Sequence, residues 1–294
     1  MEKLDRNSTV AVVGLGAIGL PVAINLVKAG TATQVWNRSD APAQKATAAG
    51  AVRVSNLADI DAKFVITVLP DIFQVNELLD KGLQASLKPG DVFVVMGTVS
   101  PVAMRTLGER LNKIGVGVLD APVSGGDIGA QQATLSIMVG GKADVLAQIQ
   151  PFFAQIGTTI RHLGALGAGQ MAKACNQIIV ATNLSAIAEA VALGRSAGLD
   201  ENMLLDIFSG GMANSRTLEL KREKIQSGDF TPGGLSAFQL KDLKIVLEAA
   251  ADTGTALPVT ETVTTLYQSM VDNDQGHLDH SAVLLEILRR SNKG

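Results

Sequence analysis

The stretch that decides the fold lies near the start of the chain and reads Val10-Ala-Val-Val-Gly14-Leu-Gly16-Ala-Ile-Gly19. It places the pattern G-x-G-x-x-G directly after an apolar strand and before a helical pattern over residues 18–29. Gly14 permits a tight turn, Gly16 lets the backbone approach a pyrophosphate, and Gly19 allows close contact between helix and strand. This context favours a dinucleotide-binding loop over a glycine turn without a ligand. The predicted cofactor contacts in this loop are Gly14, Leu15, Gly16, Ala17, Ile18 and Gly19.

Outward from this loop, short β-branched runs alternate with helical patterns as far as residue 163, which predicts βαβ units on a parallel sheet. The expected strands are 10–13, 34–36, 64–69, 92–96, 116–120, 135–139 and 158–162. Beyond residue 165 the apolar residues recur at helical spacing, and residues 169–197 predict one long helix. We therefore expect an α/β chain. A Rossmann-type, doubly wound parallel sheet over 1–164 precedes an all-α domain over 165–294 that begins with a long interdomain helix.

The composition narrows the classes of protein that fit. Of the 294 residues, 47% are hydrophobic and 18% are charged, which excludes a disordered chain. A net charge of −3 with scattered Lys and Arg argues against nucleic acid as a partner. A single cysteine, Cys175, and only three histidines predict neither a disulfide nor a metal site. Because residues 1–9 are polar and no apolar run reaches membrane-spanning length, we expect a cytoplasmic protein without a membrane partner.

The end of the second expected strand carries the signal for cofactor choice. An NAD site would place Asp or Glu there, whereas this chain has Asn37, Arg38 and Ser39. With no carboxylate to repel a 2′-phosphate, Arg38 can clamp one while its two neighbours offer neutral hydrogen bonds. We predict NADP, with NAD possible but less favoured. The alternative is a solvated Arg38 in a turn, with Asp40 supplying the carboxylate.

A second motif follows the expected strand 116–120 and reads Asp120-Ala-Pro-Val-Ser124-Gly125-Gly126. It lies at the sheet edge where open α/β folds bind ligands. The Ser124 hydroxyl and the unobstructed N–H groups of Gly125 and Gly126 can enclose a carboxylate. The alternative is an ordinary Ser-Gly-Gly turn.

The third motif opens the long helix. Lys173 and Asn176 are three residues apart and therefore lie on one helical face. Burial in a cleft beside a cationic nicotinamide ring would disfavour the charged lysine, which suits a general acid or base. The alternative is an exposed first-turn lysine. We expect Cys175 to be a small buried residue rather than a nucleophile, and the three histidines to be structural or solvated: His162, His277 and His280.

Together with Lys241-Asp-Leu243, these motifs resemble the β-hydroxyacid dehydrogenase family over nearly the whole chain. The resemblance implies that Lys173 is the catalytic acid or base, that Ser124, Gly125 and Gly126 hold a substrate carboxylate, and that Asn176 orients the substrate. It implies that Lys241 lies near nicotinamide and substrate, that Thr98 touches the cofactor, and that the helical domain forms a homodimer or homotetramer. Leu69 and Pro70 are further predicted cofactor contacts.

Together with the NADP preference expected from residues 37–39, the resemblance implies an NADP(H)-dependent oxidoreductase. It would interconvert a small-molecule carboxylated semialdehyde and its β-hydroxyacid, of the tartronate semialdehyde or 3-hydroxyisobutyrate type. The chain departs from the family pattern in four places. Where relatives usually read Asp-Met-Ser-Thr, this chain has Val95-Met-Gly97-Thr98. Asn, an aromatic residue and His are common in relatives at the positions that are here Gln177, Gly234 and Gln239, respectively. Two alternatives stay open. One is an imine reductase, which usually lacks both the carboxylate loop and the lysine, and the other is a non-catalytic NADP-binding module.

Overall fold

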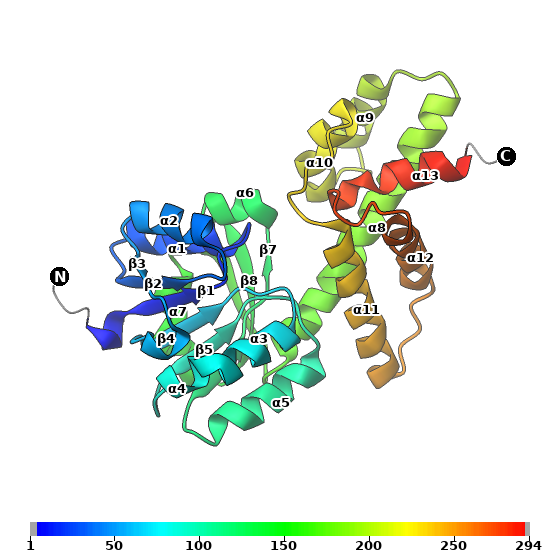
Figure 1. Cartoon of the computed structure of the whole chain (residues 1–294). Helices are drawn as coiled ribbons and strands as arrows, with labels where there is room; N and C mark the ends of the chain where they lie inside the picture. The colour runs from blue at the N-terminus through cyan, green and yellow to red at the C-terminus, as the bar shows by residue number, and fades with distance from the viewer. Residues whose placement is uncertain (1–4, 292–294) are drawn as a thin grey trace. The chain divides into compact units, whose positions relative to one another are not determined.

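The computed structural model describes residues 5–291, which form two compact units (Figure 1). We call the part of the chain up to Lys173 unit 1 and the part from Ala174 onward unit 2. The chain passes from one unit to the other inside helix α8 (Ala168–Ser196), shortly after the boundary predicted at residues 164 and 165.

Unit 1 is built on one nine-stranded sheet. Its strands are, in spatial order, β3 (Val52–Arg53), β2 (Thr33–Trp36), β1 (Val10–Val13), β4 (Phe64–Thr67), β5 (Val92–Val95), β6 (Gly117–Asp120), β8 (Leu135–Gly141) and β7 (Val123–Ser124), and β9 (Gly157–Gly164) pairs with β8. Every pair from β3 to β6 is parallel, and Val10 of β1 lies opposite Thr33 and Phe64. The predicted Rossmann-type order is therefore confirmed for this part of the sheet.

The far side of the sheet differs from the prediction of a wholly parallel arrangement, because β8 runs antiparallel to both β6 and β7. A parallel return would need a crossover that brings the chain back to the start of β6. The connection instead contains the two-residue β7 and the short helix α6 (Gly126–Gln131), which spans only about 9 Å at 1.5 Å per residue. The chain therefore enters β8 from the end where β6 finishes.

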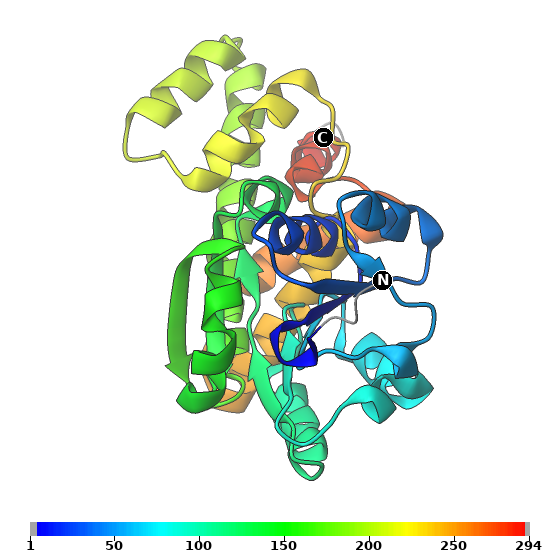
Figure 2. The same cartoon turned by 90° about the vertical axis from the view of Figure 1, so that its left-hand side faces the viewer.

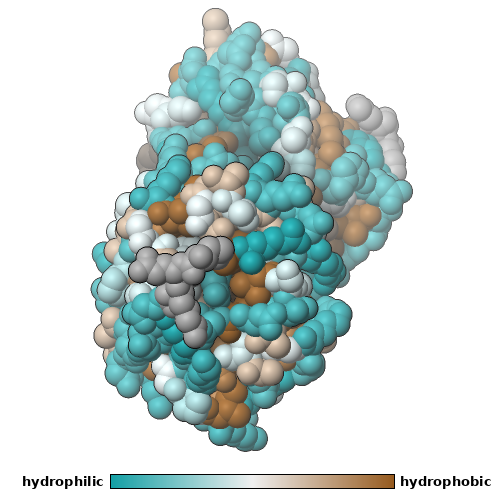
Figure 3. Space-filling view, turned by 60° about the vertical axis from the view of Figure 1, so that its left-hand side comes forward, coloured by the Kyte–Doolittle hydropathy of each residue, from teal (hydrophilic) through white to brown (hydrophobic). Residues whose placement is uncertain are grey.

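Helices cover both faces of this sheet (Figures 1 and 2). They are α1 (Gly19–Lys28), α2 (Asp40–Ala48), α3 (Ile72–Leu78), α4 (Gln84–Ser86), α5 (Pro101–Asn112), α6 and α7 (Ala143–Phe153), with short helical turns η1 (Arg6–Ser8), η2 (Leu57–Asp59) and η3 (Leu79–Leu83). Alternate residues of β1 enter separate cores. Val12 belongs to the core that includes residues of α1, α2 and α7, and Val13 belongs to the core that includes residues of α3 and α5. This confirms the doubly wound architecture. The surface of unit 1 seen in Figure 3 is mostly hydrophilic, with hydrophobic residues in small separate groups.

Unit 2 is helical, as predicted. It contains the rest of α8, α9 (Glu201–Gly210), α10 (Arg216–Ser227), α11 (Ser236–Thr253), α12 (Pro258–Asp272), the turn η4 (His280–Ala282) and α13 (Val283–Ser291). Its core includes Leu184 and Val191 of α8, Leu243 of α11 and the fully buried Tyr267 of α12. By length and composition α8 could cross a membrane, but half of its most apolar stretch is buried inside the protein, as in the core helix of a globular domain.

Candidate active site

The loop between β1 and α1 has the shape that a dinucleotide site requires. Gly14 has φ +95°, and a Cβ atom there would lie 2.5 Å from the carbonyl oxygen of Val68. A Cβ on Gly19 would lie 1.9 Å from the carbonyl oxygen of Gly14. A Cβ on Gly16 would meet no atom within 4 Å, so internal packing does not require this glycine. The space at Gly16 fits close approach of a pyrophosphate, and no side chain caps the start of α1 at Ile18.

Asn37, which follows β2, braces this loop. Its side-chain oxygen accepts a hydrogen bond from the backbone N–H of Leu15 at 2.9 Å, and its amide nitrogen donates to the hydroxyl oxygen of Ser39 at 2.9 Å. The amide is therefore engaged within the chain, whereas the sequence suggested that it would offer hydrogen bonds to the cofactor. Asn37 instead fixes the position of the glycine loop relative to the end of β2.

Arg38 and Asp40, the two charged residues next to Asn37, have different surroundings. The Arg38 side chain is 71% exposed, and its Nη2 lies 3.6 Å from Oε2 of Glu77. The Asp40 carboxylate instead forms an ion pair with Arg53 of β3. A cation therefore offsets the nearby carboxylate, while the guanidinium of Arg38 projects into solvent, where a 2′-phosphate could reach it.

The loops that follow β1, β4 and β5 interlock at the carboxyl edge of the sheet. A Cβ on Gly97 would lie 1.9 Å from the carbonyl oxygen of Leu69, next to Val68, whose carbonyl oxygen closes the space at Gly14. The structure thus brings together the predicted cofactor contacts Gly14, Leu69, Pro70 and Thr98. It also explains the departure at residue 97, because the serine that relatives carry would not fit here without displacing the backbone.

The Ser124-Gly125-Gly126 segment follows the carboxyl end of β6. Ser124 belongs to β7 and lies opposite Ser136 of β8. Gly125 has φ +131° and Gly126 has φ +63°, so both glycines adopt conformations that other residues rarely reach. A Cβ on Gly126 would meet no atom within 4 Å, which leaves its backbone accessible from that side. This geometry is compatible with the predicted carboxylate loop.

Asp120 is the last residue of β6. No role was predicted for it from the sequence, but the structure shows that it caps a helix. Its side chain is fully buried, and its two oxygens accept hydrogen bonds from the backbone N–H groups of Gly167 and Gln170, each at 2.7 Å. Burial raises the pKa of the Asp120 carboxyl, and these N–H groups offset only part of that increase. Asp120 thus caps the start of α8 from a neighbouring strand.

Gln170, in the first turn of α8, is also fully buried. Its Oε1 accepts a hydrogen bond from the backbone N–H of Val99 at 3.0 Å, and its Nε2 donates to the carbonyl oxygen of Gly97 at 2.8 Å. Both ends of the amide therefore hold the loop that carries Thr98. Sequence reasoning missed this residue, although a glutamine among small apolar residues is an available signal for a buried polar contact.

Lys173 lies three residues after Gln170, which places both side chains on the same face of α8. Lys173 is only 8% exposed, so the alternative of a solvent-exposed lysine is wrong. Cys175, which we expected to be buried, is exposed. It lies two residues, or about 200° of helical rotation, beyond Lys173 and therefore on another face of the helix.

The remaining predicted site residues belong to unit 2. Asn176 is half-buried, and its side-chain oxygen has no hydrogen-bond partner among the described residues. Lys241 lies in α11 with its Nζ 3.0 Å from Oδ1 of Asp242, and it lines a surface hollow of about 380 Å³ together with Lys244. Gln177 donates to Oδ2 of Asp242 at 2.6 Å, so the residue that departs from the family's second asparagine links α8 to α11.

The other two departures meet at one imidazole ring. A Cβ on Gly234 would lie 3.6 Å from Cε1 of His280, and Nδ1 of that ring lies 3.1 Å from Oε1 of Gln239. His280 therefore supplies a ring beside the position where relatives carry an aromatic residue. His162 is hydrogen-bonded through Nε2 to the carbonyl oxygen of Gly141 at 2.8 Å, a structural contact.

The structure thus gathers most predicted site residues at the carboxyl edge of the unit 1 sheet, while Asn176 and Lys241 are held by unit 2. Within residues 5–291, no group of three or more His, Cys, Asp or Glu side chains could hold a metal ion.

Comparison with known proteins covers both units. The family model of the NAD-binding domain of 6-phosphogluconate dehydrogenase matches residues 9–164, and that described as NAD-binding of NADP-dependent 3-hydroxyisobutyrate dehydrogenase matches residues 167–287. The chain is 38% identical over 277 residues to 2-hydroxy-3-oxopropionate reductase of Escherichia coli (strain K12), which covers 92% of this chain and 94% of that protein. It is 34% identical to 2-(hydroxymethyl)glutarate dehydrogenase of Eubacterium barkeri over 96% of this chain and 95% of that relative.

A solved structure of 3-hydroxyisobutyrate dehydrogenase of Mycobacterium tuberculosis with L-serine aligns with a TM-score of 0.82 at 33% identity, covering 94% of this chain and 98% of that one. A second solved 3-hydroxyisobutyrate dehydrogenase, of Salmonella typhimurium, aligns with a TM-score of 0.89 at 26% identity over 94% of this chain and 98% of that one. The similarity includes the dinucleotide-binding half and the helical half alike. The chain therefore belongs to the β-hydroxyacid dehydrogenase family, whose oxidoreductases use a nicotinamide dinucleotide.

Proposed function

We propose that this protein interconverts a short carboxylated semialdehyde and its β-hydroxyacid with NADP(H), and that Lys173 moves the proton. One observation carries the proposal: Lys173 is buried on the helical face of Gln170, one turn after the point where α8 is fixed to the carboxyl edge of the sheet. The E. coli relative named 2-hydroxy-3-oxopropionate reductase, 38% identical, supports this substrate class.

Each residue has a separate part in the proposed reaction. The nicotinamide dinucleotide supplies or accepts the hydride when it is bound. The Ser124 hydroxyl and the N–H groups of Gly125 and Gly126 hold the substrate carboxylate, which sets the distance from that anchor to the reacting carbon. Lys173 donates a proton to the oxygen of the aldehyde as it becomes an alkoxide, and the neutral amine takes that proton back in the reverse direction. Asn176 and Lys241 complete the substrate and nicotinamide contacts.

The preference for NADP over NAD is part of the proposal. It is supported by the exposed Arg38 guanidinium, by the absence of a carboxylate at the end of β2, and by the ion pair that offsets Asp40. Because Asn37 is engaged with Leu15 and Ser39, recognition of the 2′-phosphate falls mainly to Arg38.

We further propose a cytoplasmic homodimer or homotetramer that assembles through unit 2 without nucleic acid or membrane. Met203 and Ile207 of α9 support this assembly, since they are four residues apart on one helical face and are 71% and 74% exposed. Light scattering on the M203E/I207E double variant tests it: the variant should shift to a smaller assembly, and an unchanged mass would remove α9 from the interface.

A kinetic screen tests the substrate class. Oxidation of NADPH should be fastest with tartronate, methylmalonate or malonate semialdehyde. It should be slower with succinate semialdehyde, which has one more methylene between aldehyde and carboxylate, and with glyoxylate, whose carboxylate is adjacent to the aldehyde. Turnover of a cyclic imine but of no semialdehyde would favour an imine reductase instead. NADPH binding without turnover of any compound would point to a non-catalytic module.

A further inference from the structure

We propose that Asp120 and Gln170 are positioning residues for Lys173. Together they fix the rotation of α8 about its axis and its position along that axis, relative to the ends of β5 and β6. This inference rests on the proposed role of Lys173 as proton carrier. Neither side chain is assigned a contact with a reacting atom. They act on the reaction only through the helix.

Asp120 fixes the helix at its first turn. The first N–H groups of a helix have no partner within it, and a nearby residue of the same segment usually caps them. Here the cap comes from another strand, as one carboxylate oxygen accepts from Gly167 and the other from Gln170, both at 2.7 Å. Charge-assisted bonds of this kind are about twice as strong as neutral ones. Any sliding of α8 along its axis would break both of them.

Two glycines show how closely the chain is built around this carboxylate. A Cβ on Gly140 would lie 2.3 Å from Oδ1 of Asp120, and a Cβ on Gly169 would lie 2.8 Å from Oδ2. The latter would also lie 2.3 Å from the carbonyl oxygen of Met138. The first turn of α8 can therefore reach Asp120 only because residue 169 has no side chain.

Gln170 fixes the rotation of the helix. Its amide bonds to the backbone of Val99 and Gly97 on either side of Thr98, and it is fully buried. A rotation of α8 by one residue position, about 100°, would lose both bonds and would turn Lys173 through the same angle. Asp120 and Gln170 thus hold one helix against two strand ends, and Lys173 is the next residue on that face.

The decisive variant is Asp120→Asn, because one carboxylate oxygen becomes an NH₂ group that faces a backbone N–H donor. We expect kcat to fall about 10-fold to 100-fold, as for a small misplacement of a catalytic group. The Kd for NADPH should stay within about 3-fold, because the glycine loop and Arg38 are untouched. The pH profile of kcat should also move, since Lys173 would lose its fixed surroundings.

Asp91→Asn is the matched control, because Asp91 is a second buried aspartate of unit 1, at the opposite end of the sheet. Its loss should lower the thermal midpoint and leave both kcat and its pH profile unchanged. Gly169→Ala removes no polar group and should reproduce the fall in kcat seen for Asp120→Asn. If Asp120→Asn gives no cooperative unfolding transition, Gly169→Ala decides the test on the same readouts. Gln170→Met decides it on kcat and its pH profile alone, because Gln170 also holds the loop that carries Thr98.

Lys173→Ala separates failure of this inference from failure of the proposed function. If Lys173→Ala keeps full turnover, the proposed function fails. If Lys173→Ala is inactive while Asp120→Asn and Gly169→Ala keep the wild-type kcat and pH profile, the positioning inference is overturned and the function stands. Equal effects of Asp120→Asn and Asp91→Asn on kcat and on its pH profile would also overturn it, because both residues would then act only through overall stability.

Discussion

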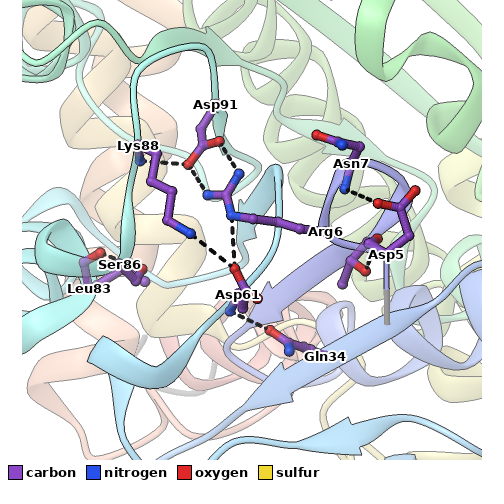
Figure 4. Close-up of polar contacts among 10 residues, drawn as sticks. Asp5, Arg6, Asn7, Gln34, Asp61, Leu83, Ser86, Lys88 and Asp91 are labelled. Atoms are coloured by element: carbon purple, nitrogen blue, oxygen red, sulfur yellow. Dashed lines mark hydrogen bonds and ion pairs between the residues drawn. The ribbon is translucent and has the colours of Figure 1, made fainter. Parts of the chain in front are cut away.

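The two buried aspartates of unit 1 occupy opposite ends of the same sheet and are stabilised in different ways. Asp91, at the amino end of β5, accepts hydrogen bonds from Nη1 and Nη2 of Arg6 at 2.7 and 2.5 Å and from the backbone N–H of Lys88 at 2.7 Å (Figure 4). Arg6 also lies 2.9 Å, through Nε, from Oδ1 of Asp61. Asp120, at the carboxyl end of β6, instead accepts hydrogen bonds from the backbone N–H groups of Gly167 and Gln170.

This difference is the one we expect if the two edges of the sheet separate stability from the proposed chemistry. At the amino edge an arginine neutralises the buried carboxylate, and the ion pair joins η1 to the start of β5. At the carboxyl edge the partial positive charge of a helix start takes the place of a cation. The Asp120 contacts therefore add no further positive side chain beside Lys173, whose proposed task depends on giving up a proton readily.

The largest expected effect separates the two edges by activity. Lys173→Ala should lower kcat about 10²-fold to 10⁴-fold, because it removes the general acid. The NADPH Kd and the thermal midpoint should change little, since the other carboxyl-edge contacts remain. Steady-state kinetics, fluorescence titration and calorimetry measure the three quantities. A parallel loss of turnover, cofactor binding and stability would assign Lys173 a structural role.

The next effect separates the edges by stability. Arg6→Ala leaves the Asp91 carboxylate buried without its cation and should lower the free energy of unfolding by about 3–5 kcal/mol. Under conditions where the variant is folded, kcat should equal that of the parent protein. Urea denaturation gives the stability. Lys88→Ala is the control. The exposed Nζ of Lys88 lies 3.3 Å from Oδ1 of Asp61, and this surface ion pair contributes about 0–1 kcal/mol to the free energy of unfolding. A lower kcat in folded Arg6→Ala would contradict the proposal that the amino edge contributes to stability and not to activity.

A smaller effect concerns cofactor choice at the carboxyl edge. Arg38→Ala should lower kcat/KM for NADPH about 10-fold to 100-fold, because a charge-assisted hydrogen bond to the 2′-phosphate is lost. The kcat/KM for NADH should stay unchanged. Lys81→Ala is the control, since Lys81 pairs with the same Glu77 but follows a different strand. An unaltered ratio between the two cofactors would contradict the phosphate clamp.

The smallest effect tests how tightly the carboxyl-edge loops are packed. Gly97→Ser should displace the Leu69 backbone, lower stability by about 1–3 kcal/mol and weaken cofactor binding a few-fold. Gly16→Ala is the counterpart: its Cβ meets no protein atom, so it should weaken cofactor binding without a loss of stability. If Gly97→Ser were as stable as the parent chain, the loops would be looser than the structure indicates.

Local patterns were enough to predict most of the fold, and they also nominated the residues of the candidate site. The glycine loop, the parallel strands and the long helix follow from residues close together in sequence, as does the helical face shared by Lys173 and Asn176. The direction of β8 did not follow, because it depends on how short α6 is. The roles of Asp120 and Gln170 did not follow either, since their hydrogen-bond partners lie 47 to 73 positions away along the chain. The reason for Gly97 likewise appears only once Leu69 is placed beside it.

The brace formed by Asn37 has a consequence for redesign of the coenzyme preference. The obvious route toward the unphosphorylated dinucleotide is Asn37→Asp, which restores an acidic group to bind the ribose hydroxyls. Aspartate could still accept the N–H of Leu15, but it could no longer donate to Ser39. That single exchange would reshape the turn at the same time as it altered recognition, so a successful switch should change residues 37 and 39 together.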